Sequence, residues 1–501
     1  MIQKRLGMLA TILVLCGTLG VLAQTKGKKT TPYCSIDELP DACVYLPAPP
    51  DVTEAAFVDD YNQYLWGKSV RPTARGKRAS WEARFGVARM ATVYGEAMNI
   101  TISQQGTPAL WRFIQRVGDT GSRSTTKAKR NYMRVRPFAR MNEPMASEFD
   151  DEKGLRTNGS YPSGHTGLGW AVALAMAEMA PEYQDTILRR GFEYGQNRVI
   201  VGAHWQSDVD AGYLTASAAY ARMHTSPEYW ADLKEARAEY RRMKGMRKEP
   251  PFMMGYPKGK KVLDAPIDTA SSRFQGDWTY YWLAKWERNT ERGWQAVRDT
   301  ACSESAFLQC FAPCVDVPLD GEETPAIAAL VSKVYVELCS VTTEAKTTGF
   351  RKRPFVQFGD ETPVPELEKA YVHSSSYPSA HALLGWGIAL ALVEVMPDFQ
   401  NAILTRGFEY GRSRVILGLH YASDVQAGRI LAACALARMH NDESFLRLME
   451  AAKREYAQVK VKLPVRPAAK VSSLSANYFL ASWLCQDFTS EFSSRYGYRC
   501  D

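Results

Sequence analysis

The chain contains 501 residues, of which 46% are hydrophobic, and its formal net charge at pH 7 is +8. This length is too great for one typical domain and predicts two or three domains with real hydrophobic cores. The Lys and Arg residues are dispersed rather than gathered into a dense basic stripe, which argues against a nucleic-acid partner and favours small anionic ligands.

Residues 1–23 have the pattern of a secretory signal peptide. Lys4 and Arg5 form its basic region, residues 6–22 are mostly apolar, and a small-residue cleavage site precedes Gln24. We therefore expect a mature protein that is periplasmic or secreted. No later stretch contains the roughly 18 to 20 continuous apolar residues of a membrane-spanning helix, so no integral membrane span is expected after cleavage.

The rest of the chain is a duplication. The segment at residues 190–195 recurs unchanged at residues 406–411, and the same offset of 216 relates other identical segments. A repeat of this length indicates two copies of one domain. The predicted boundaries are an N-terminal domain over residues 24–245, a linker rich in Pro, Gly and Lys over 246–272, a C-terminal domain over 273–460, and an aromatic, serine-rich tail over 461–501.

Each copy shows helical periodicity with almost no strand-like alternation. These patterns predict an all-α fold made of two tandem helical bundles. The apolar runs 167–180 and 382–396 are short and apolar on nearly all sides, which favours a central buried helix in each bundle. In the first copy we expect helices over residues 53–66, 79–97, 167–180, 184–197 and 208–224.

Nine of the ten cysteines follow the signal segment, so at least one of them is unpaired. The close pairs Cys34/Cys43 and Cys485/Cys500 are the disulfides that we expect in an exported protein. Cys434 lies within an apolar helical run and is expected to be a buried thiol.

Polar residues of one kind recur in three places in each copy. The first place carries a lysine and an arginine, the second a Pro-Ser-small-His turn directly before the central apolar run, and the third an arginine, a histidine and an aspartate. Two arginines and a lysine beside a helix N-terminus form a pocket for a dianionic tetrahedral oxyanion. The predicted anion-binding residues are Lys129, Arg136, Ser163, Gly164 and Arg198 in the first copy and Lys346, Arg353, Ser379, Ala380 and Arg414 in the second.

The histidines supply chemistry to this pocket. His204 and Asp208 are four residues apart, hence on one face if the segment is helical, and the carboxylate can hold the ring tautomer. An imidazole held in this way can attack phosphorus to give a phosphohistidine, and His165 can protonate the leaving alkoxide. His224 and His440 also recur, but at predicted helix C-termini, where a cation complements the helix dipole. The equivalent catalytic residues of the second copy are His420, Asp424 and His381.

These residues carry a resemblance to a known family. Segments 129–137, 162–165 and 198–208 resemble the three-part signature of the type 2 phosphatidic acid phosphatase superfamily, whose soluble members include vanadium haloperoxidases. Segments 159–166 and 202–212 are similar, more narrowly, to bacterial class A nonspecific acid phosphatases. The first copy matches this pattern almost end to end.

The resemblance implies the helical fold of acid phosphatases and haloperoxidases, and hydrolysis of small phosphorylated substrates in the periplasm without a metal or other cofactor. It implies that His204 is the nucleophile, that Asp208 orients it and that His165 is the general acid. Ser163, its neighbouring glycine and the cations would bind phosphate. Metal ligation by the histidine and aspartate is disfavoured because Arg198 would repel a cation.

The second copy departs from the pattern at Ala380, where the first copy has Gly164. If the position needs a positive φ, alanine costs about 1 kcal/mol and tilts an amide away from phosphate, whereas an ordinary φ loses little. In the first copy, Asn197 replaces the usual serine of the pattern. Every charged or titrating member survives in the second copy, so we expect that copy to be active but differently selective.

Other functions remain open within the same superfamily, namely a lipid or pyrophosphate phosphatase or a vanadate-dependent haloperoxidase. The absence of spanning segments weakens the lipid alternative. A phosphate-binding or scaffold protein would keep the cations and lose the histidines, yet both histidines occur twice. We also expect the two copies to pack on each other as a pseudo-two-fold pair, because single-copy relatives are often oligomeric.

Overall fold

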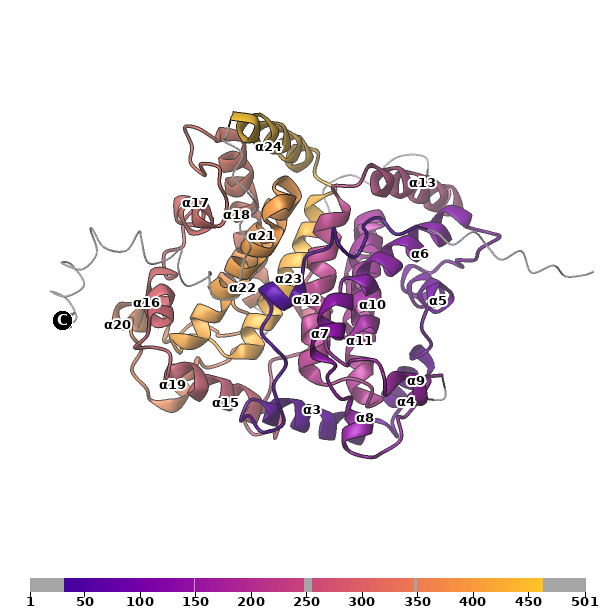
Figure 1. Ribbon diagram of the computed structural model, residues 1–501, viewed down its shortest axis with the longest axis horizontal. Coiled ribbons are helices and arrows are strands. Elements are labelled where there is room, and N and C mark those ends of the chain that lie inside the picture. Colours follow the sequence, from indigo (N-terminus) through magenta and orange to yellow (C-terminus); the bar gives the residue numbers. More distant parts are fainter. Residues whose placement is uncertain (1–30, 148, 247–254, 347–348, 463–501) are drawn as a thin grey trace, which may run out of the picture. The chain divides into compact units, whose positions relative to one another are not determined.

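The computed structural model describes residues 31–147, 149–246, 255–346 and 349–462. These residues form helices and turns without any strand, which confirms the all-α prediction (Figure 1). The predicted signal peptide, part of the predicted linker and nearly all of the predicted tail, with the Cys485/Cys500 pair, lie outside the described residues.

Both copies contain a similar succession of helices. Those of the first copy are α2 (Ala42–Tyr45), α3 (Phe57–Val70), α4 (Ala74–Glu82), α5 (Val87–Met98), α6 (Pro108–Arg123), α7 (Thr126–Tyr132), α8 (Pro137–Arg140), α9 (Glu152–Leu155), α10 (Gly164–Met179), α11 (Gln184–Ile200), α12 (Gln206–Met223) and α13 (Pro227–Met243). After α14 (Gly259–Val262), those of the second copy are α15 (Phe274–Lys285), α16 (Glu291–Arg298), α17 (Glu304–Phe311), α18 (Pro325–Ala345), α19 (Pro354–Phe358), α20 (Pro365–Tyr371), α21 (Ala380–Val395), α22 (Gln400–Ile416), α23 (Ala422–Met439) and α24 (Glu443–Lys462).

The central helix of each bundle is α10 in the first copy and α21 in the second. All residues of α10 after Gly164 are buried, and α10 packs against α6, α11 and α12, just as α21 packs against α18, α22 and α23. A helix that is apolar all round is stable only when neighbours cover every side, so the predicted buried helices are confirmed. Each begins at its Pro-Ser turn, because the hydroxyls of Ser163 and Ser379 accept from the N–H groups of Thr166 and Ala382 at 3.3 and 3.4 Å.

The prediction of a single helix over residues 79–97 is wrong, because α4 and α5 divide it. Gly86 has a φ of 119°, which side-chain-bearing residues rarely adopt, so a new helix starts at Val87. The break leaves Ala83 at the end of α4, where its carbonyl accepts a hydrogen bond from Nε2 of His165 at 2.9 Å. This irregularity therefore orients one of the predicted catalytic histidines.

The two copies contact each other through α12 and α23, which lie side by side in the middle of Figure 1. At the ends of these helices, the rings of His224 and His440 stack with centroids 3.8 Å apart. Nε2 of each ring lies 3.1 Å from a buried carboxylate, Glu178 for the first and Glu394 for the second. These histidines thus cap their helices as expected, but the expectation missed that they also join the two copies.

The disulfide predicted between Cys34 and Cys43 is absent, because both residues are free thiols. Sγ of Cys34 lies 3.9 Å from the carbonyl oxygen of Arg222, whereas Cys43 lies on α2 and its N–H donates to Asp41. Closeness along the chain therefore does not bring the two sulfurs into bonding geometry. Cys434 is a buried thiol within α23, which confirms that prediction.

Helix α18 has 21 residues and a mean hydropathy of 1.4, so by length and composition alone it could cross a membrane. It is the one such helix among the described residues. Leu330, Val334 and Leu338 on this helix are buried, and α18 packs against α21 and α24. These contacts bury one face of α18 against the bundle, and 39% of its apolar window is buried.

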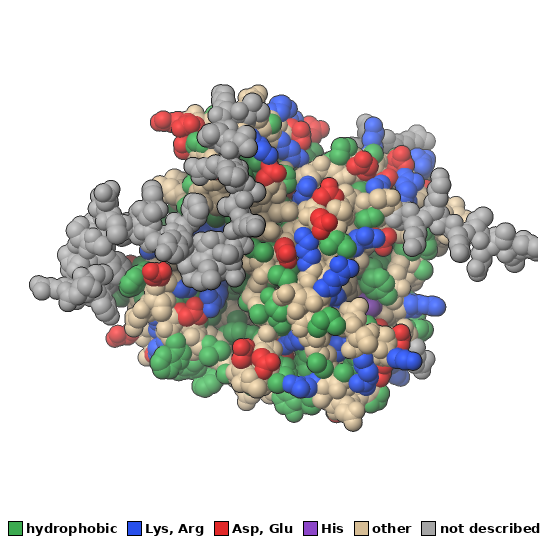
Figure 2. Space-filling view, in the orientation of Figure 1, with side chains coloured by type: hydrophobic (Ala, Val, Ile, Leu, Met, Phe, Trp, Pro, Cys, Tyr) green, Lys and Arg blue, Asp and Glu red, His purple; other side chains and the backbone are tan. Residues whose placement is uncertain are grey.

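Charges of both signs share the surface. On the face shown in Figure 2, Lys and Arg side chains alternate with Asp and Glu, and no continuous basic stripe is visible. This agrees with the dispersed basic residues of the sequence.

The second copy also exposes Trp278, Trp282 and Trp286 along one side of α15, with exposed fractions of 48%, 36% and 83%.

Candidate active sites

His204 and Asp208 meet at the turn between α11 and α12 rather than along one helix. Gly202 in this turn has a φ of 80°, and a Cβ there would lie 2.5 Å from Nη2 of Arg71, so the turn requires glycine. Asp208 lies in the first turn of α12, where Oδ2 accepts from the N–H of Trp205 at 2.8 Å. Nδ1 of His204 is 3.4 Å from the same oxygen. The predicted pairing of His204 with Asp208 is therefore present, but it arises at the start of α12 and not along one face of a helix.

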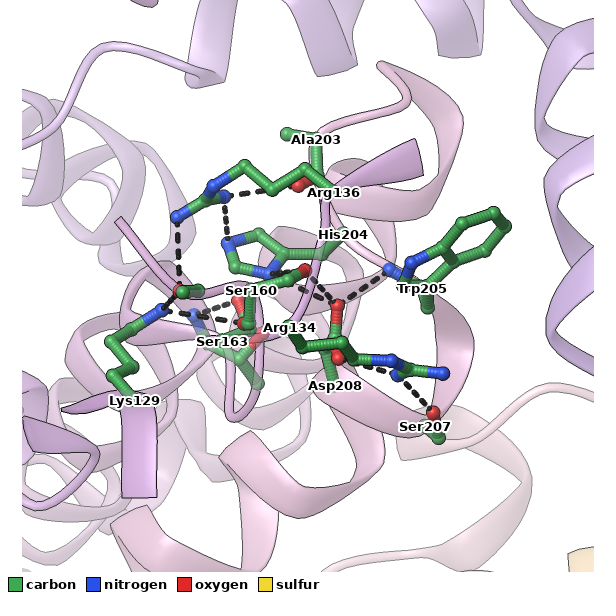
Figure 3. Close-up of polar contacts among 12 residues, drawn as sticks. Lys129, Arg134, Arg136, Ser160, Ser163, Ala203, His204, Trp205, Ser207 and Asp208 are labelled. Atoms are coloured by element: carbon green, nitrogen blue, oxygen red, sulfur yellow. Dashed lines mark hydrogen bonds and ion pairs between the residues drawn. The ribbon is translucent and has the colours of Figure 1, made fainter. Parts of the chain in front are cut away.

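The other ring nitrogen of His204 faces the predicted anion pocket (Figure 3). Nη1 of Arg136 lies 2.9 Å from Nε2, and since an arginine only donates, Nε2 is the acceptor and Nδ1 carries the proton toward Asp208. Burial, followed by Arg136 and Lys129, holds the pKa of His204 well below its usual value. The ring is therefore neutral, with a lone pair on Nε2 that can attack an electrophile.

A further arginine, absent from the predicted residues, holds the aspartate of each site. Arg134 donates to Oδ1 of Asp208 at 2.7 Å and to Oδ2 of Asp60 at 2.6 Å. Burial alone would raise the pKa of Asp208, but Arg134 and the neighbouring histidine outweigh it, and the pKa lies below its ordinary value. Arg351 donates to Oδ1 of Asp424 at 2.5 Å in the second copy. The sequence signal for this pair is the recurrence of the arginine 217 residues later.

Lys129 and Arg136 lie beside the N-terminus of α10. Nζ of Lys129 donates to the carbonyl of Gly159 at 2.6 Å, and Nη1 of Arg136 donates to that of Ala203 at 3.0 Å. Burial and then Arg136 lower the pKa of Lys129 well below its usual value, and burial and then Arg198 lower that of Arg136 to about 10. Buried cations that depress each other's pKa favour a bound anion.

The Pro-Ser turn is equally well formed in both copies. Gly164 is the first residue of α10 and has no positive φ, and a Cβ there would lie 3.6 Å from Cε of Lys129 and from Oγ1 of Thr125. Ala380 begins α21 at the equivalent position. Since this position has an ordinary φ, the geometry supports the case in which replacing glycine by alanine costs little free energy.

His165 is the second residue of α10. Its Nε2 donates to the Ala83 carbonyl, so Nδ1 is the nitrogen that can exchange a proton with a ligand. In the second copy Nε2 of His381 lies farther from its carbonyl, 3.5 Å from that of Thr300. Burial and then Arg198 lower the pKa of His165 to about 3. The predicted general acid is therefore neutral here, and a bound dianion is needed to raise its pKa.

The second site repeats the contacts of the nucleophile with a longer histidine–aspartate distance. Nη1 of Arg353 lies 2.9 Å from Nε2 of His420, as in the first copy. Nδ1 of His420 is 3.7 Å from Oδ2 of Asp424, too far for a hydrogen bond. Nζ of Lys346 donates to the carbonyl of Ser375 at 2.7 Å, and burial and then Arg353 lower its pKa to about 7.

The two sites differ most at their last arginine. Both terminal nitrogens of Arg198 pair with the carboxylate of Asp150, at 3.2 and 3.0 Å. Arg414 is fully buried, and none of its three guanidinium nitrogens has a hydrogen-bond partner among the described residues. The sequence did not predict this contrast, because a carboxylate in the connection between α8 and α9 has no fixed spacing to an arginine on α11.

The unusual Asn197 takes over a contact that a serine makes in the second copy. Nδ2 of Asn197 donates to Glu82 at 2.5 Å, and the hydroxyl of Ser413 donates to Asp299 at 2.5 Å. Glu82 also pairs with Arg190 of the repeated segment. The repeated segment therefore helps to fix α11 against α4. Glu82 and Asp299 are another pair, 217 residues apart, and neither was among the predicted site residues.

Comparison with known proteins gives matches over both copies. Residues 120–231 and 325–446 match the PAP2 superfamily. A non-specific acid phosphatase of Providencia stuartii is 40% identical over 213 residues, which cover 42% of this chain and 86% of the relative. A non-specific acid phosphatase of Salmonella typhimurium is 37% identical over 220 residues, or 44% and 88% of the two chains. An acid phosphatase of Zymomonas mobilis is 36% identical over 214 residues, or 42% and 80%.

Each of these relatives is matched over most of its own length by less than half of this chain. The superfamily match itself occurs twice, once in each repeat. Both observations confirm the resemblance and the duplication. The chain belongs to the PAP2 superfamily and contains two tandem copies of its domain.

Proposed function

We propose that each copy hydrolyses small phosphomonoesters through a phosphohistidine intermediate, with His204 and His420 as nucleophiles. The observation that carries this proposal is the neutral Nε2 of His204, which faces Arg136 while Asp208 lies behind the ring. The names of the relatives, non-specific acid phosphatases, support the same reaction class. The residues that we infer to bind phosphate are Lys129, Arg136, Ser163, Gly164 and Arg198 in the first copy and Lys346, Arg353, Ser379, Ala380 and Arg414 in the second.

In the first step, Nε2 of His204 attacks phosphorus in line with the leaving oxygen. A P–N bond forms as the P–O bond breaks, and the bonding pair stays on the alkoxide, which takes a proton from Nδ1 of His165. The charge of the bound dianion raises the pKa of His165 from about 3, so that it carries this proton. Asp208 stabilises the proton that remains on Nδ1 of the phosphorylated ring.

In the second step, water attacks phosphorus and gives a proton to Nδ1 of His165. The P–N bond breaks, its electron pair returns to Nε2 of His204, and inorganic phosphate leaves. Lys129, Arg136 and the N–H groups that begin α10 stabilise charge on the equatorial oxygens in both steps. These groups are held by the protein before substrate arrives, so little reorganisation accompanies the reaction.

We also propose that the enzyme acts outside the cytoplasm. The support is the signal-like composition of residues 1–23 together with relatives that are bacterial non-specific acid phosphatases. Cell fractionation of the full-length chain, with removal of residues 1–23 as the control, tests this proposal.

A third proposal is that the two copies form a pseudo-two-fold pair. The stacked His224 and His440 support it, as do hydrogen bonds between copies from Gln426 to the Asp210 carbonyl at 3.1 Å and from Arg237 to Asn441 at 2.7 Å. Contacts between equivalent residues are expected at such an axis. Small-angle scattering that fits two separated beads would contradict it.

The decisive experiment is to trap the phosphoenzyme. The full chain reacts with a radiolabelled phosphomonoester and is quenched in alkaline denaturant, where phosphohistidine is stable. We expect label on both copies, label on one copy in His204→Ala or His420→Ala, and none in the double variant. His373→Ala, an exposed histidine, is the matched control and retains full labelling.

Label in the double variant would contradict the nucleophile assignment. Full activity in His420→Ala together with none in His204→Ala would contradict an active second copy. Vanadate distinguishes a phosphatase from a haloperoxidase, because it inhibits a phosphatase, whereas a haloperoxidase loaded with vanadate would oxidise bromide when hydrogen peroxide is supplied as the oxidant.

A further inference from the structure

A carboxylate of the chain pairs with one of the predicted phosphate-binding arginines of the first site. Oδ1 and Oδ2 of Asp150 accept from Nη2 and Nη1 of Arg198 at 3.0 and 3.2 Å, a two-pronged pair. The side chains are only 1% exposed for Arg198 and 6% for Asp150. Arginine binds phosphate oxygens with the same fork, so a phosphoryl group and this carboxylate compete for one set of donors.

Other groups of the site also face Asp150. Arg198 and Tyr194 approach from α11, His165 from the start of α10, and Arg136 from the residue before α8. Burial alone would raise the pKa of the Asp150 carboxyl, but Arg198 and His165 lower it below its ordinary value. The carboxylate is therefore charged above pH 3.8, where it competes with phosphate for Arg198.

Among the described residues, no carboxylate competes in this way at the second site. Arg414 is 0% exposed, and Nε, Nη1 and Nη2 have no hydrogen-bond partner among the described residues. The segment from Arg353 to His381 is one residue shorter than that from Arg136 to His165, and none of its described carboxylates bonds Arg414. A buried guanidinium without partners is costly unless an anion joins it.

We propose that Asp150 is a specificity-determining residue that makes the two sites unequal, with a low-affinity first site and a high-affinity second site for phosphate. This rests on the proposed function. Phosphate must displace the Asp150 carboxylate from Arg198, whereas at Arg414 it fills a vacant set of donors. If the paired form makes up nine-tenths of the first site, its apparent affinity falls about tenfold.

Calorimetric titration of the full chain with inorganic phosphate tests this proposal without any turnover. We expect two classes of sites, of which Arg414→Ala removes the tight class and Arg198→Ala the weak one. Asp150→Asn should tighten the weak class about tenfold. Asp151→Asn, which removes the same charge at the neighbouring exposed position, is the matched control and leaves both classes unchanged.

A kinetic measurement separates competition from a merely structural role. In the His420→Ala background, Asp150→Asn should lower the KM of the first site and leave kcat within about twofold, whereas partial unfolding lowers kcat without tightening binding. An unchanged affinity for phosphate in Asp150→Asn, with phosphoenzyme still formed, overturns this inference and leaves the proposed function intact. Absence of both phosphate binding and phosphoenzyme overturns both.

Discussion

The imidazole rings of His224 and His440, 216 residues apart in the sequence, stack with their centroids 3.8 Å apart at the contact between the two copies. Nδ1 of each ring lies 2.9 Å from a backbone carbonyl, and Nε2 lies 3.1 Å from Glu178 or Glu394. Both nitrogens of each ring thus lie near oxygen atoms that can accept a hydrogen bond. Burial lowers the pKa of the His440 ring, but Glu394 outweighs burial and the pKa is raised above its ordinary value.

This cluster predicts a loss of stability in acid. The pKa of Glu178 is lowered from 4.5 to about 2, since burial, which raises it, is outweighed by His224 and His440. A lowered folded-state pKa stabilises the fold above pH 4.5, and this stabilisation, about 3 kcal/mol, is lost as the pH falls toward 2. Urea midpoints of the wild type should fall over this range, and those of Glu178→Gln should start lower and fall less. Glu235→Gln, at an exposed carboxylate, should follow the wild type.

Arg134 should affect the rate of the first site more than its binding. Arg134→Lys keeps a charge near Asp208 but loses the fork to Asp60, so the histidine loses its exact orientation. In the His420→Ala background we expect kcat to fall about 100-fold with KM changed less than about threefold. Arg351→Lys in the same background is the control, because it alters only the second copy. A change confined to KM would place Arg134 among the phosphate ligands instead.

The pH dependence of the first site should lack the usual acid limb of a histidine base. His204 must be unprotonated to attack, and burial and then Arg136 hold its pKa well below the ordinary 6.5. Because the folded-state pKa is lowered, the reactive form persists as the pH falls below 6.5. In the His420→Ala background, kcat/KM, corrected for ionisation of the substrate, should not decrease between neutral pH and pH 5. A limb of unit slope near 6.5 would show that the cations do not protect the ring.

Exchanging glycine and alanine at the first residue of the central helix, Gly164 or Ala380, should have little effect on activity. A Cβ at Gly164 meets only ordinary contacts at 3.6 Å, and Ala380 occupies the same place in α21. Gly164→Ala and Ala380→Gly should each change kcat/KM of their own site less than about threefold, about 0.7 kcal/mol. Gly202→Ala is the contrasting variant, because residues with a side chain rarely adopt its φ of 80°. A tenfold loss in Gly164→Ala would show that the added methyl group displaces Lys129.

Much of each candidate site was predictable from the repeat. Charged residues and histidines that recur together at one offset are hard to explain as solvated surface, and the structure brings Lys129, Arg136, His165 and His204 around the start of α10. The helical fold was predictable from the periodicity of the apolar residues. Neither prediction required knowledge of how the chain runs between the helices.

What escaped prediction depends on such paths or on backbone conformation. Helical periodicity continues across residues 83–86, but the turn there, with the positive φ of Gly86, separates α4 from α5. Asp150 reaches Arg198 across 48 residues through a connection whose route no spacing specifies. Cys34 and Cys43 are near in sequence, but their sulfurs face different neighbours. The replacement of Gly164 by Ala380 can be read from the sequence. The contrast between the paired Arg198 and the unpaired Arg414 can be recognised only from the structure.

Joining the two copies in one polypeptide has a consequence for how the enzyme behaves on dilution. Two separate chains that met through α12 and α23 would come apart at low concentration. Within one chain the partner is always present, at an effective concentration that is on the order of millimolar for short linkers. The two candidate sites are likewise present one to one in every molecule. If their affinities for phosphate differ as proposed, a single molecule would respond over a wider span of phosphate ester concentrations than either site could alone.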